Sequence, residues 1–394
     1  MDTSPLKIGY CLSLSGALAS NGKTARLAHR IWQEKVNARG GLLGRPVELV
    51  CIDDQTNPKL VADIYQRLLD VEKVDLVIGG YGDNSVAPAM PLIIERRRFF
   101  LGLMALAVNA KFHYPQYFVM IPTGPQPHLA LSEGFFELAG QQSPRPETVA
   151  ILIADAPFSQ SPAQGARDNL ARHGMRVISE SKYPLSPTTD FAPYMADLKR
   201  INPDVLFLCS YINDSIGLIK AMNAAGLSPK LVGGAMIGPQ NGVVKAELGA
   251  LLNGLVNYEY WLPVPSLINP QIESLIATYQ ARAEEAGADP LGYYVAPLAY
   301  AQMQVLEQAI RAVDRADDAA LSDYTRTTTF DTVVGKVTFG EGGGWSRPRV
   351  LTVQFQNIQS NAISEFKRPN TQVVVYPSET ASGSVIYPYA TPKR

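Results

Sequence analysis

Polar side chains gather in one short stretch, "GGYGDNSVAPA", which follows the apolar run "VDLVI". Asp83, Asn84 and Ser85 stand where a buried strand should end and a helix begin, and Tyr81 precedes them. A phosphate-binding loop would need the spacing GxxxxGK[ST] or GxGxxG, and this stretch has neither the lysine nor the third glycine. The free N–H groups and partial positive charge of a helix start favour a carboxylate instead. The same residue types also cap ordinary helices, so a binding role and a capping role both stay open.

The composition excludes several classes of protein. The chain has 394 residues, of which 46% are hydrophobic and 18% are charged, and its formal net charge is -1, which together are typical of a globular protein. We expect no nucleic-acid partner, because such proteins usually present a basic face. No apolar run is long enough to span a bilayer. The start, "MDTSPLKIGY", lacks the charged and apolar regions of a signal peptide, which predicts either a cytoplasmic protein or a mature exported one.

Residues that could support catalysis or bind a metal are few and scattered. The three cysteines, Cys11, Cys51 and Cys209, each lie in an apolar run, which indicates buried thiols, although a Cys11–Cys51 disulfide stays open. The chain has no CxxC, GxSxG or HExxH motif. The four histidines have no evident carboxylate or serine partner; they are His29, His113, His128 and His173. We therefore predict no catalytic residue, no metal and no cofactor, and a protein that is not an enzyme.

Strands and helices alternate along most of the chain. Apolar, β-capable runs are expected at 6–14, 45–54, 74–80, 98–106, 117–123, 147–155, 175–184, 203–211, 229–236 and 252–261. Amphipathic helices are expected between them, including one at 85–97, and two more follow at 269–287 and 293–313. This alternation predicts an α/β fold with parallel sheets covered on both faces. The end differs, because 335–356 reads as two strands around a glycine-rich turn and 371–394 as a surface tail.

Several motifs together resemble one known family. The chain contains "KIGYCLSLSGALASNGK", "VNARGGLLGRPVELVCIDDQTNPKLVADIYQRLL", "VDLVIGGYGDNSVA" and "TTDFAPYMADLKRINPDVLFLCSY" in this order. They resemble the branched-chain amino acid type of periplasmic substrate-binding protein, which has the type I fold of ABC-transporter binding proteins. The most specific element is the turn N-x-x-GG-x-x-G-R that leads into DDQ-x-x-P, and the resemblance runs from about residue 6 to about residue 355.

The resemblance implies two Rossmann-like lobes joined by three hinge crossings, with the ligand in the cleft between the lobes. We expect the crossings near residues 121–125, 256–260 and 334–338. Lobe 1 would then consist of residues 1–121 plus 257–335, and lobe 2 of residues 122–256 plus 336–394. The strand pattern agrees with this expectation, because ligands of open α/β sheets bind outside the carboxyl ends of the strands.

The resemblance also implies which loops contact the ligand. The positions that match them are Ser20, Asn21, Tyr81, Asp83, Asn84, Ser85, Met104, Ala105, Leu106, Phe158, Tyr211, Asn213, Met236 and Ile237. Two loops depart from the amino acid binders. Met104, Ala105 and Leu106 stand where those proteins have a Ser/Ala/Thr cluster, and Met236 and Ile237 where they tend to carry an acid for the ligand's ammonium. An unpaired ammonium in a closed cleft is costly, so Asp83 or Asp214 would have to replace that acid.

Three functions stay open on the sequence. The first is the solute-binding component of an ABC importer for a small aromatic carboxylate, of the benzoate or phenylpropanoid type, captured by hinge closure. The second keeps the fold and binds a branched-chain or other amino acid, or an amide. The third is a cytoplasmic ligand sensor on the same fold. For the first two we expect a periplasmic monomer that docks on a membrane permease without spanning the membrane itself. Asp83 separates the first two, since it either turns away from the ligand or binds a donor such as a ring hydroxyl or an ammonium.

Overall fold

The first apolar run of the chain forms a buried strand at the centre of a parallel sheet. This strand, β1 (Leu6–Leu12), lies between β2 (Val47–Asp53) and β3 (Leu76–Val77). The computed structural model describes residues 4–390. It divides the chain into two compact units: the first ends at Pro125 and resumes over Ile268–Pro348, and the second contains Gln126–Leu267 and the residues from Arg349 on.

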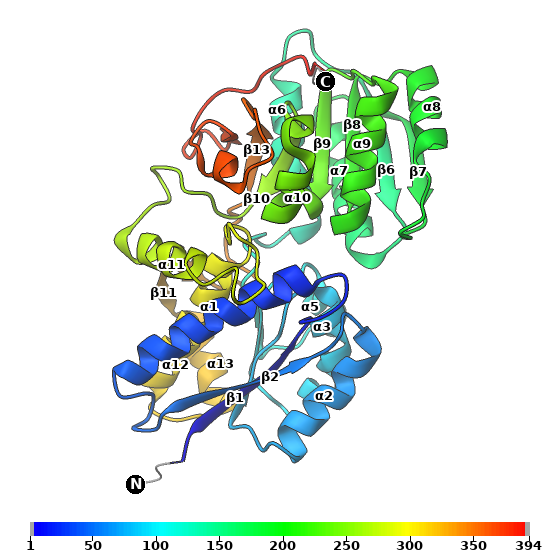
Figure 1. Cartoon of the computed structure of the whole chain (residues 1–394). Helices are drawn as coiled ribbons and strands as arrows, with labels where there is room; N and C mark the ends of the chain where they lie inside the picture. The colour runs from blue at the N-terminus through cyan, green and yellow to red at the C-terminus, as the bar shows by residue number, and fades with distance from the viewer. Residues whose placement is uncertain (1–3, 391–394) are drawn as a thin grey trace. The chain divides into compact units, whose positions relative to one another are not determined.

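The first unit places helices on both faces of its sheet (Figure 1). Its further strands are β4 (Phe100–Gly102), β5 (Tyr117–Val119), β11 (Thr329–Thr332) and β12 (Gly335–Thr338). Its helices are α1 (Ala19–Ala38), α2 (Pro58–Asp70), α3 (Asp83–Val86), α4 (Met90–Glu95), α5 (Val108–Phe112), α11 (Pro270–Gln280), α12 (Ala296–Val313) and α13 (Asp318–Thr327), with the 3-10 helix η1 (Ala87–Ala89). α12 packs along α1, while α2 packs against η1 and α4.

Two glycines let the backbone of β4 approach the end of β3. A Cβ atom on Gly79 would lie 2.8 Å from the Cα atom of Gly102, closer than side chains tolerate. At this distance the Gly79 N–H donates to the carbonyl of Leu101. The side-chain amide of Gln302, on α12, then donates to the carbonyls of Gly79 and Leu101 at 3.0 and 2.7 Å. The loops that follow β3 and β4 are therefore fixed at the same edge of the sheet.

The second unit contains a larger sheet with strand order β14-β13-β10-β9-β8-β6-β7. Its strands are β6 (Thr148–Ala154), β7 (Arg176–Tyr183), β8 (Val205–Ser210), β9 (Leu231–Met236), β10 (Val256–Glu259), β13 (Leu351–Phe355) and β14 (Gln372–Tyr376). Its helices are α6 (Pro127–Gly140), α7 (Pro157–Arg172), α8 (Ala192–Ile201), α9 (Ile212–Ala225) and α10 (Gly242–Leu248), with the 3-10 helices η2 (Gly238–Gln240), η3 (Gly249–Leu252) and η4 (Ile363–Lys367). α6 packs on α7, and α9 packs on α8 and α10 (Figure 1).

Three predicted elements differ from the structure. The helix expected at 85–97 is broken into α3, η1 and α4, because Pro88 and Pro91 cannot donate to the preceding turn. The two strands expected in 335–356 do not pair with each other: β12 pairs with β11, whereas β13 is fully buried between β10 and β14. The expected tail contains β14, because the β-branched run in "QVVVY" favours a strand, which pairs with β13 at the edge of this sheet.

The units divide after Pro125, Leu267 and Pro348, and the crossings that we expected lie near residues 121–125, 256–260 and 334–338. The loop after β10 stays with the second unit, where the Trp261 indole donates to the carbonyl of Leu267 at 3.2 Å. The glycine-rich turn stays with the first unit, because the Val119 N–H donates to the carbonyl of Gly343. Across residues 4–390, no helix has the length and apolar character needed to cross a membrane.

Candidate functional site

The first turn of α1 brings polar groups to the carboxyl end of β1. A Cβ atom on Gly22 would lie 1.9 Å from the carbonyl oxygen of Ser13, so only glycine lets the helix start this close to the loop. Asn21 is 1% exposed, and its side-chain nitrogen has no hydrogen-bond partner among the described residues. Ser20, beside it, is partly exposed. A hydroxyl and an uncommitted amide donor are thus available at this position.

Asp83 ties the loop after β3 to the loop after β4. It begins α3, directly after Gly82, whose φ of 83° favours glycine. One carboxylate oxygen of Asp83 accepts the Leu106 N–H at 2.7 Å. Burial raises the pKa of Asp83 to about 6, against the lowering effect of hydrogen bonds from the Leu106 and Ala107 backbone. The carboxyl group therefore already has a structural partner, and it is only weakly acidic.

Ser85 is turned toward a buried carboxylate. Asp54 is 1% exposed, and it accepts hydrogen bonds from the hydroxyls of Ser13 at 2.5 Å and Ser85 at 2.6 Å. The Ser85 proton is therefore directed to Asp54, which joins the loops after β1, β2 and β3. Asn84 is partly exposed, and its side chain makes no hydrogen bond within the described part of the chain. Because α3 spans only Asp83–Val86, it supplies little of a helix dipole.

The remaining predicted residues of the first unit are apolar or aromatic. The Tyr81 hydroxyl lies 3.0 Å from the Tyr294 hydroxyl, and the two rings meet edge to face. The loop after β4 buries Met104, Ala105 and Leu106. This loop offers a ligand backbone groups and apolar side chains.

In the second unit, two aromatic side chains pack together at the ends of β6 and β8. The Phe158 and Tyr211 rings meet edge to face with their centroids 5.7 Å apart. The Tyr211 hydroxyl accepts the Phe158 N–H at 3.0 Å, which fixes the start of α7 against the start of α9. Both side chains are partly exposed. They present an aromatic surface at the carboxyl edge of this sheet.

Asp214 is committed within the same unit. It is buried and accepts the Tyr183 hydroxyl at 2.6 Å and the Tyr211 N–H at 3.1 Å with one oxygen. Burial raises the pKa of Asp214, and these hydrogen bonds oppose the rise. Asn213, its neighbour on α9, is exposed. The carboxyl group of Asp214 thus caps a helix and anchors a tyrosine.

Met236 ends β9 and Ile237 follows it directly, and both side chains are buried. The Asn257 side chain holds this strand end, because its oxygen accepts the Met236 N–H at 3.0 Å and its nitrogen donates to the Met236 carbonyl at 2.8 Å. The backbones of β9 and β10 pair at Gly233 and Val256. At the end of β9 the side chain of Asn257 bonds the Met236 backbone in place of such pairing.

The sequence reasoning did not identify the partners that hold the predicted residues. Asp54 had a signal, since it follows the apolar run of β2 directly, but "DDQ" entered only as part of the resemblance. Tyr183 also ends a strand, β7. No sequence signal pointed to Tyr294, because it lies 213 residues from its partner Tyr81 in the chain.

One statement about the histidines is corrected by the structure. His128 lies 3.8 Å from a carboxylate oxygen of Asp168, and His173 lies 3.4 Å from one of Glu137, because α6 and α7 pack side by side. His128 and Glu137 lie on α6, Asp168 lies on α7, and His173 follows α7 directly. Among residues 4–390, Cys11, Cys51 and Cys209 are free thiols, and no group of His, Cys, Asp or Glu is arranged to hold a metal ion.

The comparisons with known proteins all find binding proteins. The model of a family described as periplasmic binding protein matches residues 5–355. The chain is 24% identical over 375 residues to Leu/Ile/Val-binding protein homolog 8 of Brucella melitensis, covering 89% of this chain and 88% of that protein. A solute-binding protein of an ABC transporter from Rhodopseudomonas palustris, solved with 3,4-dihydroxybenzoic acid, has a TM-score of 0.76 at 16% identity and covers 100% of this chain and 99% of its own. A branched-chain amino acid transporter substrate-binding protein from Streptococcus pneumoniae, solved with isoleucine, has a TM-score of 0.76 at 15% identity and covers 90% and 98%. At these identities the structural likeness supports the fold.

Proposed function

This chain belongs to the periplasmic binding protein family, and we propose that, as the solute-binding protein of an ABC transporter, it captures a small aromatic carboxylate of the benzoate or phenylpropanoid type. The family binds solutes for transport and is not a family of enzymes. The ligand would be held between the two units and trapped when one closes on the other. The loaded protein would then dock on a membrane permease in the periplasm.

The choice of ligand rests on the hydrogen bonds and the pKa values of two candidate acids, Asp83 and Asp214. An α-amino acid needs a carboxylate for its ammonium group, since a buried unpaired ammonium is costly. Asp214 already accepts the Tyr183 hydroxyl, and Asp83 already accepts the Leu106 N–H. Burial raises the pKa of both acids, which disfavours the charged form that an ammonium requires. A ligand without an ammonium group fits these acids better.

The character of the loops supports an aromatic body. Met104 and Leu106 are buried at the end of β4, and Met236 is buried at the end of β9. Phe158 and Tyr211 present their rings at the start of α7 and α9. Burying about 150 Å² of an aromatic ring among such side chains contributes about 4 kcal/mol.

The carboxylate of the ligand would be held by amide donors of the first unit. Asn84 and Asn21 have side-chain nitrogens without a partner in residues 4–390, and Ser20 adds a hydroxyl. The Ser85 hydroxyl is less suitable, because its proton is directed to Asp54. Two side-chain amides and a hydroxyl match the acceptor oxygens of one carboxylate.

A branched-chain amino acid is the second candidate, favoured by a relative named as a Leu/Ile/Val-binding protein homologue and by a structural neighbour solved with isoleucine. Binding would then require Asp83 or Asp214 to leave its present partner or to use its second oxygen. That requirement makes this candidate the weaker of the two.

Calorimetry and thermal unfolding against a matched panel distinguish the candidates. The panel contains 4-hydroxybenzoate, 3,4-dihydroxybenzoate and cinnamate on one side, and leucine, isoleucine and leucinamide on the other. A ligand present at 100 times its Kd stabilises the folded protein by about 2.7 kcal/mol. We expect at least one aromatic acid to do so. Stabilisation by leucine or isoleucine, with every aromatic acid silent, would overturn the proposal.

A further inference from the structure

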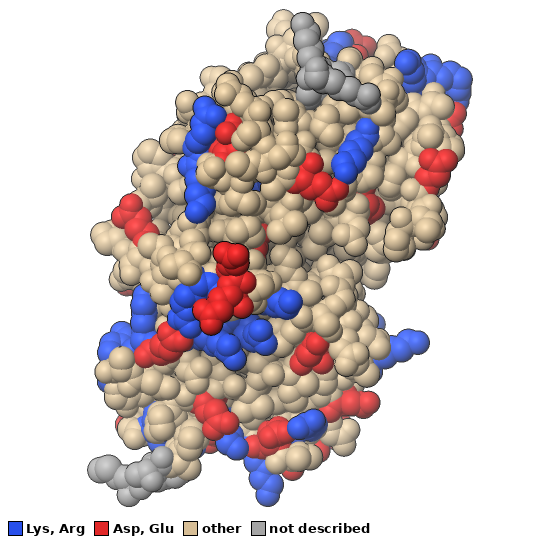
Figure 2. Space-filling model, in the orientation of Figure 1, with Lys and Arg blue, Asp and Glu red and all other residues tan. Residues whose placement is uncertain are grey.

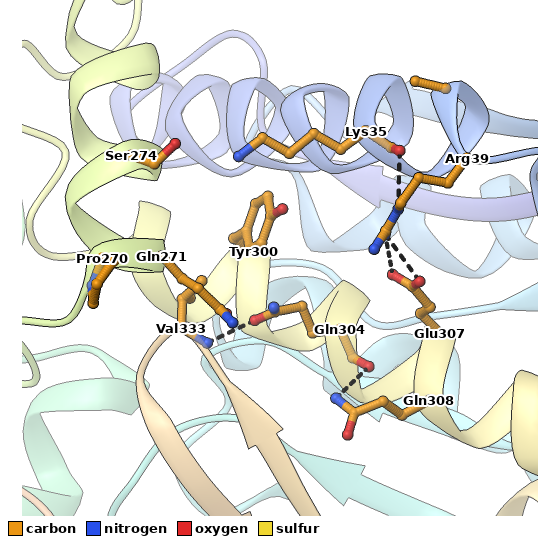
Figure 3. Close-up of a pocket in the computed structure, with 11 residues that line it drawn as sticks. Lys35, Arg39, Pro270, Gln271, Ser274, Tyr300, Gln304, Glu307, Gln308 and Val333 are labelled. Carbon is orange, nitrogen blue, oxygen red and sulfur yellow. Dashed lines mark hydrogen bonds and ion pairs between the residues drawn. The ribbon is translucent and has the colours of Figure 1, made fainter.

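A hollow lies outside the predicted ligand loops, on the helical face of the first unit. It is a groove of about 680 Å³ among α1, α11 and α12, with Val333 at one end (Figure 3). Its volume is in the range of small-molecule sites. All of its lining residues belong to the first unit, and none is among the predicted ligand contacts.

The one carboxylate that lines the groove is already neutralised. Glu307 accepts the Trp32 indole N–H at 2.9 Å and ion pairs with Arg39 and Arg311, each at 3.0 Å. Two cations and one neutral donor therefore converge on a single negative charge. The residues around Glu307 keep a surplus of positive charge that an incoming anion would meet.

Two of the amides in the groove are also committed. The Gln304 side-chain oxygen accepts the Val333 N–H at 2.7 Å. The Gln308 side chain donates to the carbonyl of Asp331 and accepts the N–H of the same residue. These contacts fix the β11–β12 hairpin against α12. They give the groove a rigid wall instead of free ligand-binding groups.

The remaining polar groups of the groove have no ion pair or side-chain hydrogen bond among the described residues. Lys35 has its ammonium 5.4 Å from the centroid of the Tyr300 ring, and it makes no ion pair among the described residues. The side chains of Gln271 and Ser274, both exposed on α11, make no hydrogen bond in that part of the chain, nor does the Tyr300 hydroxyl. Burial raises the pKa of Tyr300, so its hydroxyl stays a donor at neutral pH. Figure 3 shows the Lys35 ammonium extended along α1 toward Ser274, above the Tyr300 ring.

We propose that this groove is a second binding site, for a small organic anion that carries a carboxylate or phosphate group. The anion would pair with the Lys35 ammonium and accept hydrogen bonds from the Tyr300 hydroxyl, the Gln271 amide and the Ser274 hydroxyl. Lys and Arg side chains gather along α1 on the face shown in Figure 2, beside acidic ones. The sequence of α1 and its C-cap carries Lys23, Arg26, Arg30, Lys35 and Arg39, and such cations raise the local concentration of anions.

The test follows the Trp32 indole by NMR. Protein labelled with ¹⁵N-tryptophan gives one indole signal for each of its three tryptophans. The Trp32 indole bonds to Glu307, which lines the groove, and its signal is assigned with Trp32→Phe. Citrate and inorganic phosphate are titrated separately at an ionic strength held constant with sodium chloride. We expect a saturable shift of the Trp32 signal with at least one of them; citrate alone indicates a carboxylate site, and phosphate alone a phosphate site.

Matched variants connect the shift to the groove. Lys35→Met keeps the stem over Tyr300 and removes the charge, and we expect it to raise the Kd of the anion at least tenfold. Tyr300→Phe removes one donor and should raise it a few-fold. Lys111→Met is the control, because the Lys111 ammonium lies over Phe112 at the same 5.4 Å but outside the groove.

Two results would overturn this second site. One is a Trp32 signal that responds to neither probe, or that sodium chloride alone moves equally. The other is a Lys35→Met protein that titrates like the unaltered one. Neither result bears on the proposed transport ligand, because a response to aromatic acids through the loops of Asn84 and Phe158 does not require the groove.

Discussion

Single acidic residues in this chain are understood best by what they already bind. Asp83 stands beside the proposed carboxylate site, where a full negative charge would repel the ligand. Its hydrogen bond from the Leu106 N–H ties the loop after β3 to the loop after β4. Burial raises the pKa of Asp83 to about 6. The sequence predicted the position of Asp83 and left its role open, because no pattern of letters tells which of two nearby loops supplies a partner.

The raised pKa of Asp83 predicts how ligand affinity depends on pH. The carboxyl group is mostly ionised at about pH 8 and mostly neutral at about pH 5, since its pKa is about 6. The affinity for an anionic aromatic acid should therefore rise a few-fold as the pH falls over this range. An amino acid that paired its ammonium with Asp83 would instead bind more weakly as the pH falls.

Calorimetry at several pH values measures this trend, and Asp83→Asn is the control variant. Asparagine keeps an oxygen for the Leu106 N–H but does not titrate, so its affinity should stay flat. The Tyr117 hydroxyl nearby stays protonated throughout, because burial raises its pKa well above the usual value. A pH dependence that survives in Asp83→Asn would assign the titration to another group.

Comparison of the predicted and observed helices and strands shows which elements a sequence pattern is sufficient to predict. Long amphipathic helices such as α1 and α12 are predicted because their apolar residues follow one period, and buried strands such as β6 and β8 because each is a continuous apolar run. β14 and the pairing of β12 with β11 were not predicted, because the partner of a short strand depends on distant segments of the chain that bury it. The partners of the site residues were missed for the same reason.

Gln302 links α12 to the loops after β3 and β4, and its substitution should lower the stability of the protein. Gln302 is fully buried, donates to the carbonyls of Gly79 and Leu101, and contacts His29 at 3.1 Å. Gln302→Leu removes the donor to the buried Gly79 carbonyl and one of the two donors to the Leu101 carbonyl, and we expect a loss of about 3 kcal/mol in the free energy of unfolding. Urea denaturation measures the loss. Gln271→Leu, at an exposed position of α11, should change the same quantity by less than about 0.5 kcal/mol.

A buried ion pair between α10 and β10 gives a second prediction for the elements. Lys245 and Glu259 lie 3.2 Å apart with side chains that are 0% and 1% exposed. Lys245→Met removes the buried cation that pairs with the Glu259 carboxylate and should destabilise the protein by about 3–5 kcal/mol. The exposed pair Lys220–Glu247 in the same unit is the control, and Lys220→Met should cost about 1 kcal/mol or less. Equal losses for both variants in urea denaturation would contradict the role of burial.

For the whole molecule, the alternation of strands and helices was enough to predict parallel sheets. The division into two units came from the family resemblance, because each unit is assembled from separate segments of the chain. The last strands show why: β10 and β13 pair across about 90 residues that belong mostly to the first unit. Local propensity does not encode such a return of the chain.

Two units assembled in this way predict a change of shape on binding. If an aromatic acid is trapped between them, the closed form must bind it more tightly than the open form, and the ligand shifts the population toward the closed form. Small-angle X-ray scattering should then show a smaller radius of gyration at saturating ligand. Asn84→Ala should need a higher ligand concentration, by about tenfold for one lost hydrogen bond to a carboxylate, to reach the same decrease. Unchanged scattering while calorimetry shows full occupancy would mean that the ligand binds without closure.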